Sequence, residues 1–177
     1  MSSQLPEPDR ALDQAQTAIT ALSALIDQAL TGLKPAVSEN GKLSASKLDS
    51  HQLACYDIAL CWSECTAATF MLSHAARIKT EGLSELSLRL TALFCAETLS
   101  SALGRLRLRP ADYGLEMHNI LEIESNAALC DFIATQMASS NIAEIGRQLQ
   151  ENHGDLGPDL LGAVSYTHLT LPTKRIV

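Results

Sequence analysis

Apolar residues recur at every third or fourth position near the start of the chain, and this spacing limits the folds that the chain can adopt. The repeat consists of Leu12, Ala15, Ile19, Leu22, Ile26, Ala29 and Leu33. Because an α-helix turns once in about 3.6 residues, these side chains share one face of a helix. We predict an amphipathic helix that Asp9 caps and that Gly32 and Pro35 end.

A linker over residues 35–45 is predicted next, because Asn40-Gly41 is a turn signal. Ser46, with Asp49 three residues later, resembles a capping box at the start of a second helix. Nothing in the sequence that follows breaks a helix before about residue 79, so this second helix is predicted to be long and continuous.

The middle of the second helix is apolar on several faces. A narrow stripe through Ser50, Asp57 and Glu64 stays polar. A helix with apolar residues nearly all round is usually central, so we expect it to have neighbours on more than one side. The apolar residues are Leu53, Ala54, Tyr56, Ile58, Ala59, Leu60, Trp62, Ala67, Phe70, Met71 and Leu72.

A third helix is predicted to begin after Ser84 as its cap and to end at Gly104, with Pro110 beyond it. The turn at residues 109–115 is expected to pack Tyr113 against the bundle. Two shorter helices are predicted at about 126–138 and 141–152, each with an asparagine in the cap position. The apolar repeat of the third helix contains Leu86, Leu90, Leu93 and Leu103, with Glu97 in the same register.

These segments predict an all-α fold, an antiparallel helical bundle of three long and two shorter helices over residues 9–160. Residues 1–8 are polar, contain Pro6 and Pro8, and are expected to be disordered. Aromatic residues make up 4% of the chain and hydrophobic residues 46%, so the core must be built mainly from Leu, Ala and Ile. Such small and medium side chains suit helices that pack closely.

The charge balance argues against several partner classes. The net charge is −7, and residues 1–163 carry 11 of the 13 basic residues and all 20 acidic ones. An acidic body binds nucleic acid poorly, because neutralised phosphates supply most of that affinity. It is equally unsuited to anionic membranes. Asp57 and Glu64 interrupt the most apolar segment, so we expect no membrane-spanning helix.

The five cysteines are odd in number, and residues 1–9 lack the basic start and apolar run of a signal peptide. We therefore expect a cytoplasmic protein with reduced thiols.

His51 and Cys55, and again Cys61 and Cys65, are four apart and could each face one zinc ion. The two pairs are rotated relative to one another, which favours cysteines that fill gaps in an Ala-rich core.

Two other pairs of residues could be catalytic. Cys65 with His74, or Cys95 with Glu97, could act as nucleophile and base, although a reactive thiol needs a basic and open setting. Packing between helices is the favoured role for these cysteines. The sequence contains no Gly-rich phosphate loop, no Gly-x-Ser-x-Gly elbow and no His-Glu-x-x-His pair.

Asp57 and Glu64 are seven residues apart and could be paired carboxylates for acid–base chemistry, but the water-facing side of a helix is the favoured interpretation. Glu116 and His118 have the wrong spacing for a di-iron ligand pair.

The alternating Arg and Leu residues at 105–109 could bind an anion or an acidic partner, although a contact with the helix dipole is favoured. No residue is assigned as catalytic, cofactor-binding or metal-binding.

The last fourteen residues resemble the translation of a transposon-type sequencing adapter rather than a natural protein sequence. We therefore expect residues 164–177 to be non-native and the natural sequence to be interrupted near Ala163. The alternative is an ordinary C-terminal strand, since Val, Tyr, Thr and Ile favour strands. The adapter-like run is Val164, Ser165, Tyr166, Thr167, His168, Leu169, Thr170, Leu171, Pro172 and Thr173.

Three segments of the sequence carry a family resemblance: Gly41-Lys42-Leu43, Leu48-Asp49-Ser50-His51-Gln52-Leu53-Ala54 and Arg109-Pro110-Ala111-Asp112-Tyr113-Gly114-Leu115. Together they resemble the helical N-terminal extension of certain acyl-CoA dehydrogenases, of the (2S)-methylsuccinyl-CoA dehydrogenase type. The resemblance covers roughly residues 9–160. Two departures are residues 101–108, which replace a Gly- and Pro-containing stretch, and Tyr113, where leucine is usual.

This resemblance implies a parent flavoprotein that oxidises an acyl-CoA with FAD, using a glutamate base in a core that would follow Ala163. The present chain would be an accessory helical domain that docks on that core or on a neighbouring subunit. It would hold neither the catalytic residues nor the FAD. Two alternatives stay open: a free-standing helical module that binds another protein without enzymatic activity, and a small metal or redox bundle that uses the cysteines.

Overall fold

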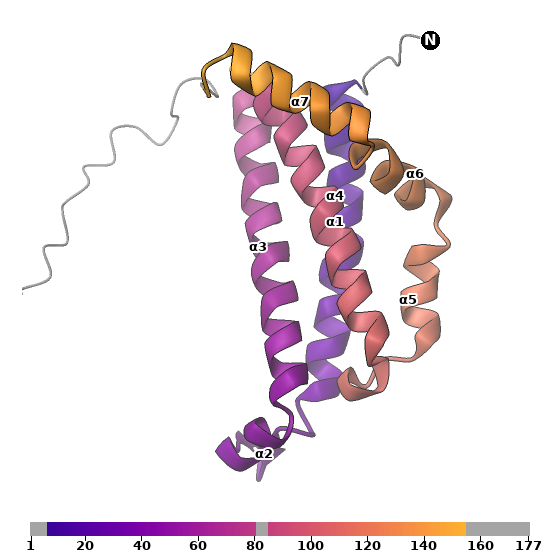
Figure 1. Cartoon of the computed structure of the whole chain (residues 1–177). Coiled ribbons are helices and arrows are strands. Elements are labelled where there is room, and N and C mark those ends of the chain that lie inside the picture. The colour runs from indigo at the N-terminus through magenta and orange to yellow at the C-terminus, as the bar shows by residue number, and fades with distance from the viewer. Residues whose placement is uncertain (1–6, 81–84, 155–177) are drawn as a thin grey trace, which may run out of the picture.

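The computed structural model of the chain describes residues 7–80 and 85–154. The all-α prediction is confirmed, because these residues form seven α-helices and a ladder of two very short strands. Three long helices lie side by side and alternate in direction (Figure 1). They are α1 (Pro8–Leu33), α3 (Gln52–Thr80) and α4 (Glu85–Leu108).

Four shorter helices and a 3₁₀ turn complete the described structure. α7 lies across one end of the bundle, and α5 and α6 lie on the side away from α3 (Figure 1). Together they cover parts of α1 and α4. The elements are α2 (Ala45–Ser50), the 3₁₀ helix η1 (Pro110–Tyr113), α5 (Met117–Glu124), α6 (Ala127–Gln136) and α7 (Ser139–Glu151).

The central helix is α4, not the second long helix, α3. Helix α4 packs against α1 and α3 and also contacts α5, α6, α7 and η1. Helix α3 packs mainly against α1 and α4 and has the short α2 at one end. The prediction that α3 is central was therefore wrong. Its apolar residues are split between a buried side and a side that no described residue covers.

The start of α1 differs from the prediction. Helix α1 begins at Pro8, with Glu7 in the N-cap position, so Asp9 lies in the first turn rather than at the cap. Proline suits the first helical position because its fixed φ is already helical and its missing N–H is not needed there. The end of α1 agrees with the prediction, since the helix stops at Leu33, two residues before Pro35.

The turn at Asn40-Gly41 is confirmed. Both residues have positive φ, 50° and 75°, as a two-residue hairpin turn requires. The turn joins β1 (Ser38–Glu39) and β2 (Lys42–Leu43), which pair in antiparallel fashion. The sequence was expected to form a plain linker here, because two-residue strands are too short to show an alternating pattern.

The predicted continuous second helix is broken at His51, whose φ of −112° and ψ of 24° separate α2 from α3. Ser44 is the N-cap residue of α2, so Ser46, the predicted cap, lies inside the first turn. The Ser44 and Ser46 hydroxyl groups are 3.1 Å apart.

Residue 84, the predicted cap of the third helix, and residues 164–177 lie outside the described ranges.

The later helices agree with the prediction in part. Asn126 caps α6 by accepting hydrogen bonds from the backbone N–H groups of Ala128 and Leu129. Asn141 is not a cap but a buried residue within α7, and its amide donates to the Gln136 carbonyl over 2.7 Å. Gly104 does not end α4, which continues to Leu108. Helix α5 was not predicted.

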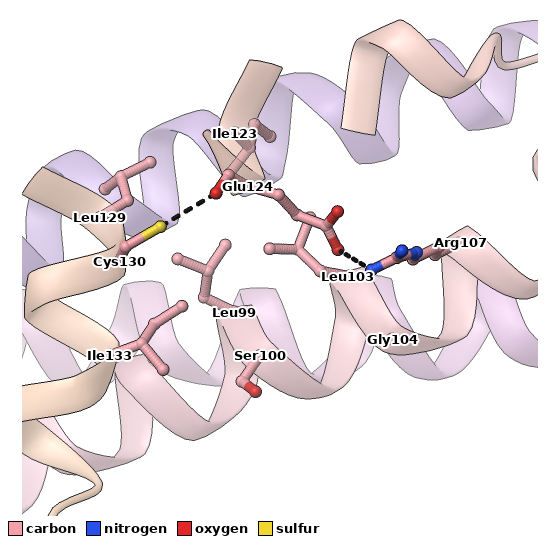
Figure 2. A pocket seen from close by; sticks show the side chains of 10 residues that line it. All are labelled: Leu99, Ser100, Leu103, Gly104, Arg107, Ile123, Glu124, Leu129, Cys130 and Ile133. Atoms are coloured by element: carbon pink, nitrogen blue, oxygen red, sulfur yellow. Dashed lines mark hydrogen bonds and ion pairs between the residues drawn. The ribbon is translucent and has the colours of Figure 1, made fainter. Parts of the chain in front are cut away.

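The side of α4 away from α3 faces α5 and α6. Leu99 and Leu103 of α4 lie across from Leu129 and Ile133 of α6 (Figure 2).

Among the described helices, α4 is the one long and apolar enough to span a membrane. A core helix has the same length and composition, so this property alone assigns no membrane location.

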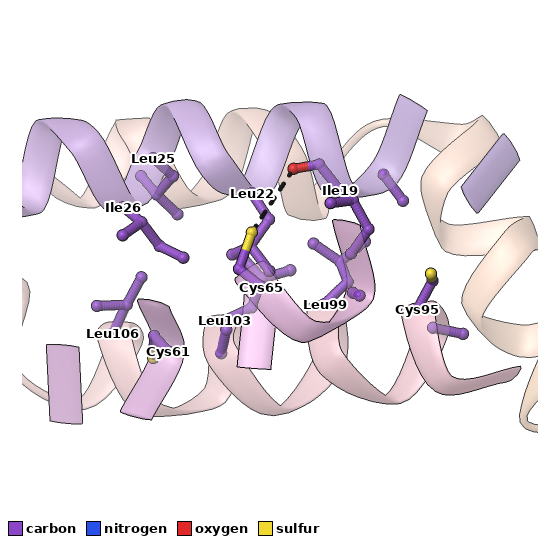
Figure 3. Packing of buried hydrophobic residues seen from close by; sticks show 14 of the residues in the cluster. Ile19, Leu22, Leu25, Ile26, Cys61, Cys65, Cys95, Leu99, Leu103 and Leu106 are labelled. Carbon is purple, nitrogen blue, oxygen red and sulfur yellow. Dashed lines mark hydrogen bonds between the residues drawn. The ribbon is translucent and has the colours of Figure 1, made fainter. Parts of the chain in front are cut away.

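The core between α1, α3 and α4 is built from aliphatic, alanine and cysteine side chains. Leu22 and Ile26 of α1 meet Leu99 and Leu106 of α4, with Cys61 of α3 beside them (Figure 3). Small side chains let the helix backbones approach closely. Seven alanines of these helices are fully buried: Ala15, Ala18, Ala29, Ala68, Ala92, Ala96 and Ala102.

Two glycines let the end of α1 touch the turn after α4. A Cβ atom added to Gly32 would lie 2.1 Å from the Tyr113 carbonyl oxygen and 2.9 Å from the Gly114 Cα atom. Gly114 has a φ of 63°, which favours glycine. This close approach helps to place Tyr113 in the core, and its complete burial confirms the predicted packing of that residue.

We expect Gly32→Ala to lower the free energy of unfolding by roughly 1–3 kcal/mol, because the new methyl group would overlap backbone atoms. Gly146→Ala is the matched control, since a Cβ atom there meets nothing within 4 Å. That change should stabilise the protein by up to about 1 kcal/mol through helix propensity. Urea unfolding followed by circular dichroism measures both values, and equal effects of the two changes would contradict the proposed contact.

Candidate functional site

The two carboxylates on α3 face another helix rather than water. Glu64 Oε2 accepts a hydrogen bond of 2.8 Å from Arg105 Nη1, and Asp57 Oδ2 accepts one from Arg109 Nη2. Glu64 and Arg105 are part-buried, and the Asp57 side chain is only 16% exposed. The favoured interpretation of Asp57 and Glu64 as the water-facing stripe of this helix was therefore wrong.

Asp57 also binds the turn after α4. The Tyr113 hydroxyl donates to Asp57 Oδ2 over 3.2 Å, and Arg109 Nε lies 3.6 Å from Asp112 Oδ2. Burial and the neighbouring Asp57 carboxylate together raise the pKa of Tyr113 to about 12. Asp57 thus joins α3 to the end of α4 and to η1, and nothing in this arrangement requires it to act as a general base.

The arginines at 105, 107 and 109 are divided between two neighbours. Arg105 and Arg109 reach Glu64 and Asp57 on α3, whereas Arg107 Nη1 lies 3.3 Å from Glu124 Oε1 at the end of α5. Because residues two apart on a helix point in nearly opposite directions, an alternating run supplies cations to both sides of α4. The sequence showed the run but not its partners, which are 17 to 52 residues away.

The cysteines of the predicted zinc pairs are mostly in the core. Cys61 and Cys65 are buried against α1 and α4, and the Cys65 thiol points to the Ile19 carbonyl oxygen at 4.0 Å (Figure 3). Burial raises the pKa of Cys61 to about 11 and also raises that of Cys65. His51 and Cys55 are half-buried near the start of α3. In the described ranges, no three His, Cys, Asp or Glu side chains gather as a metal site would require.

The predicted nucleophile pairs do not form. Cys95 is fully buried while Glu97, two residues along α4, is exposed, so the two side chains point apart. Burial raises the pKa of Cys95 to about 12, which disfavours a reactive thiolate. Cys65 is directed toward α1 and not toward His74. These thiols have the setting of core residues.

The side of α3 that points away from α1 and α4 carries large apolar side chains in contact with solvent. Leu53, Tyr56, Trp62 and Phe70 are 68%, 65%, 53% and 72% exposed. Between residues 52 and 76 the only Asp, Glu, Lys or Arg residues are Asp57 and Glu64, and both are paired with α4 or its end. We call this side the outer face of α3.

The outer face of α3 is long as well as apolar. From residue 52 to residue 76 it extends for roughly 35 Å at about 1.5 Å per residue. Small or polar side chains lie between the large ones, namely exposed Ala59, Ser63, Ala67, Thr69 and Ser73. Scattered exposed apolar residues are ordinary in proteins, but three aromatic rings on the uncharged, exposed half of one helix are typical of an interaction surface.

A scan of the sequence against protein-family models finds no match, and a search among curated proteins finds no matching sequence.

We expect Asp57→Asn to lower the free energy of unfolding by roughly 1–3 kcal/mol, because Arg109 and Tyr113 lose a part-buried anionic acceptor. Glu64→Gln should cost less than about 1 kcal/mol, since Glu64 is 29% exposed against 16% for Asp57 and its carboxylate has a single partner, Arg105. Urea unfolding at pH 7 measures both values. A larger effect of Glu64→Gln would show that the Asp57 contacts do not hold α3.

The raised pKa of Tyr113 predicts a loss of stability in alkali. The fold favours the neutral phenol, so this contribution is complete below pH 10 and is lost as the pH rises through about 12. The difference in unfolding free energy between the unmodified protein and Tyr113→Phe should therefore shrink from pH 9 to pH 12. A difference that stays constant over this range would mean that the hydroxyl is not held by Asp57.

Proposed function

We propose that this chain is a helical docking domain that binds another protein through the outer face of α3. The observation that carries the proposal is the exposed, uncharged half of α3, with Tyr56 and Phe70 near its middle and Leu53 and Trp62 at its two edges. Burial of such rings in a partner is favourable in proportion to the apolar area removed from water. Tryptophan and tyrosine are also the residues that most often dominate binding energy at interfaces.

The partner that we propose is the catalytic core of an FAD-dependent acyl-CoA dehydrogenase, in the same polypeptide or in a neighbouring subunit. The support is the resemblance of residues 41–43, 48–54 and 109–115 to the helical extension of such enzymes. In the structure the first two segments contribute to the hairpin, to α2 and to the start of α3, and the third contains η1. Arg109 and Tyr113 of the third segment bind Asp57 of α3, so this segment lies where α3 is anchored to the bundle.

The chemistry of the outer face favours protein over other partners. Binding to nucleic acid depends on Lys and Arg beside phosphates, and this face has neither. An anionic membrane would be repelled by a chain with a net charge of −7. An apolar protein surface needs no charge on either side. We place the interaction in the cytoplasm, in keeping with the free cysteines.

The role of the domain under this proposal is structural and not chemical. FAD and acyl-CoA would be held by the partner, and we assign no residue of this chain to either molecule. The buried Cys61, Cys65 and Cys95 pack the bundle. A docking domain of this kind would position or pair catalytic cores, and its removal should lower the stability of the assembly rather than alter the reaction.

Photo-crosslinking in cells of the source organism tests the docking face. A benzoylphenylalanine in place of Phe70 should give an adduct with an acyl-CoA dehydrogenase flavoprotein, identified by mass spectrometry. The matched position is Leu108, which is equally exposed, 73% against 72%, but lies at the end of α4. It should give no such adduct. An adduct from position 70 with a protein that binds no flavin would favour the free-standing interaction module instead.

We expect Trp62→Ser and Phe70→Ser to weaken binding to the captured partner by at least tenfold, because each removes a large apolar contact. Phe70→Ser should change the free energy of unfolding by no more than about 0.5 kcal/mol, since Phe70 is 72% exposed. Trp62→Ser should lower it by roughly 1–2 kcal/mol, because Trp62 is 53% exposed and its buried part is lost from the bundle. Leu108→Ser is the control and should leave binding unchanged. Equal losses for all three variants, or no loss for any, would rule out the outer face of α3 as the contact.

A further inference from the structure

A cavity of about 450 Å³ lies between α4, α5 and α6, on the side of the bundle away from the outer face of α3 (Figure 2). Its volume is within the range of small-molecule sites in proteins. The aliphatic side chains of Leu99, Leu103, Leu129 and Ile133 form one part of its wall. Arg107 stands at the other part, so the cavity has an apolar end and a cationic end.

A glycine inside a helix keeps the cavity open. Ser100, Leu103, Gly104 and Arg107 form one stripe of α4 along the cavity wall, because their spacing of three and four puts them on one face. A glycine in a helix interior is less favourable than alanine by about 1 kcal/mol. Packing does not require it here, since a Cβ atom at residue 104 would meet nothing within 4 Å. The missing side chain enlarges the cavity.

The cation at the cavity is held loosely. Arg107 Nη1 lies 3.3 Å from Glu124 Oε1, and the Arg107 side chain is 59% exposed. The Glu124 side chain is 24% exposed, but an ion pair with so exposed a cation contributes little to stability. The Glu124 carboxylate can therefore be replaced by another carboxylate at small cost. The rest of the wall offers the Ser100 hydroxyl, the Cys130 thiol and aliphatic carbon, with no second cation.

We propose that this cavity binds an aliphatic carboxylate of medium length. Its chain would lie against Leu99, Leu129 and Ile133, passing the space left by Gly104. Its carboxylate would take the place of Glu124 beside Arg107, where a charge-assisted hydrogen bond is stronger than a neutral one. This site is separate from the docking face and does not depend on the proposed partner.

Titration of the ¹⁵N-labelled, 177-residue chain with sodium octanoate, followed by NMR, tests the proposal. The amide signals of Ser100 and Cys130 should shift and saturate with a dissociation constant on the order of 1 mM or below. Sodium acetate, which has no chain, and 1-octanol, which has no charge, should each bind at least fivefold more weakly. Equal binding of 1-octanol would overturn the role of Arg107.

Arginine variants test the cationic end. Arg107→Gln should weaken octanoate binding at least fivefold. Arg147→Gln is the matched control, because Arg147 is similarly exposed, 54%, and is also paired with glutamate, but lies on α7. It should leave binding unchanged. Glu124→Gln should tighten binding severalfold, since it removes the competing carboxylate, an effect that a purely structural role of the pair would not produce.

Variants of Gly104 test whether the space left by its missing side chain is needed for binding. Gly104→Leu should abolish the saturable shifts while leaving the melting temperature equal or higher, because leucine favours the helix and meets open space. Gly146→Leu, a glycine in α7 with the same open surroundings, should not affect binding. Phe70→Ser should also leave it unchanged, which separates this site from the docking face. Unaltered octanoate binding in Gly104→Leu would refute the proposal.

Discussion

The packing of α4 against α1 and α3 through very small side chains is the constraint on which the rest of the structure depends. Alanines such as Ala18, Ala68 and Ala96 are fully buried at these contacts, so the three helices are held close together. There is little room between them for aromatic rings, and on α3 Tyr56, Trp62 and Phe70 lie on the outside. The packing that makes the bundle tight thus leaves the largest side chains of α3 in contact with solvent.

Much of the fold follows from sequence periodicity, and the exceptions have physical causes. The long helices, the Asn40-Gly41 turn and the Asn126 cap were predictable because each depends on residues close together in the chain. The break at His51 was not, since no Gly or Pro marks it. Helix α5 escaped prediction because eight residues, Met117–Glu124, are too few to show a clear helical repeat.

The candidate surfaces were harder to predict, because periodicity does not say which face of an apolar helix is covered. On α3 the polar stripe was taken for the solvent side, and the aromatic residues for the buried side. The structure reverses part of this: Asp57 and Glu64 meet arginines that lie 52 and 41 residues further on, respectively, while Tyr56 and Phe70 face water. A stripe of carboxylates on a helix can mark an ion-paired contact when another segment supplies matching cations.

The arginines that alternate with leucines at residues 105–109 contact elements next to both proposed surfaces, the outer face of α3 and the cavity. Arg105 and Arg109 point to α3 and fix the helix that carries the outer face, whereas Arg107 points to α5 and the cavity. Leu106, between them, is fully buried in the core. Helix α4 packs against α3 on one side and against α5 and α6 on the other, so it separates the outer face of α3 from the cavity. We therefore expect a ligand in the cavity to leave the outer face of α3 unchanged.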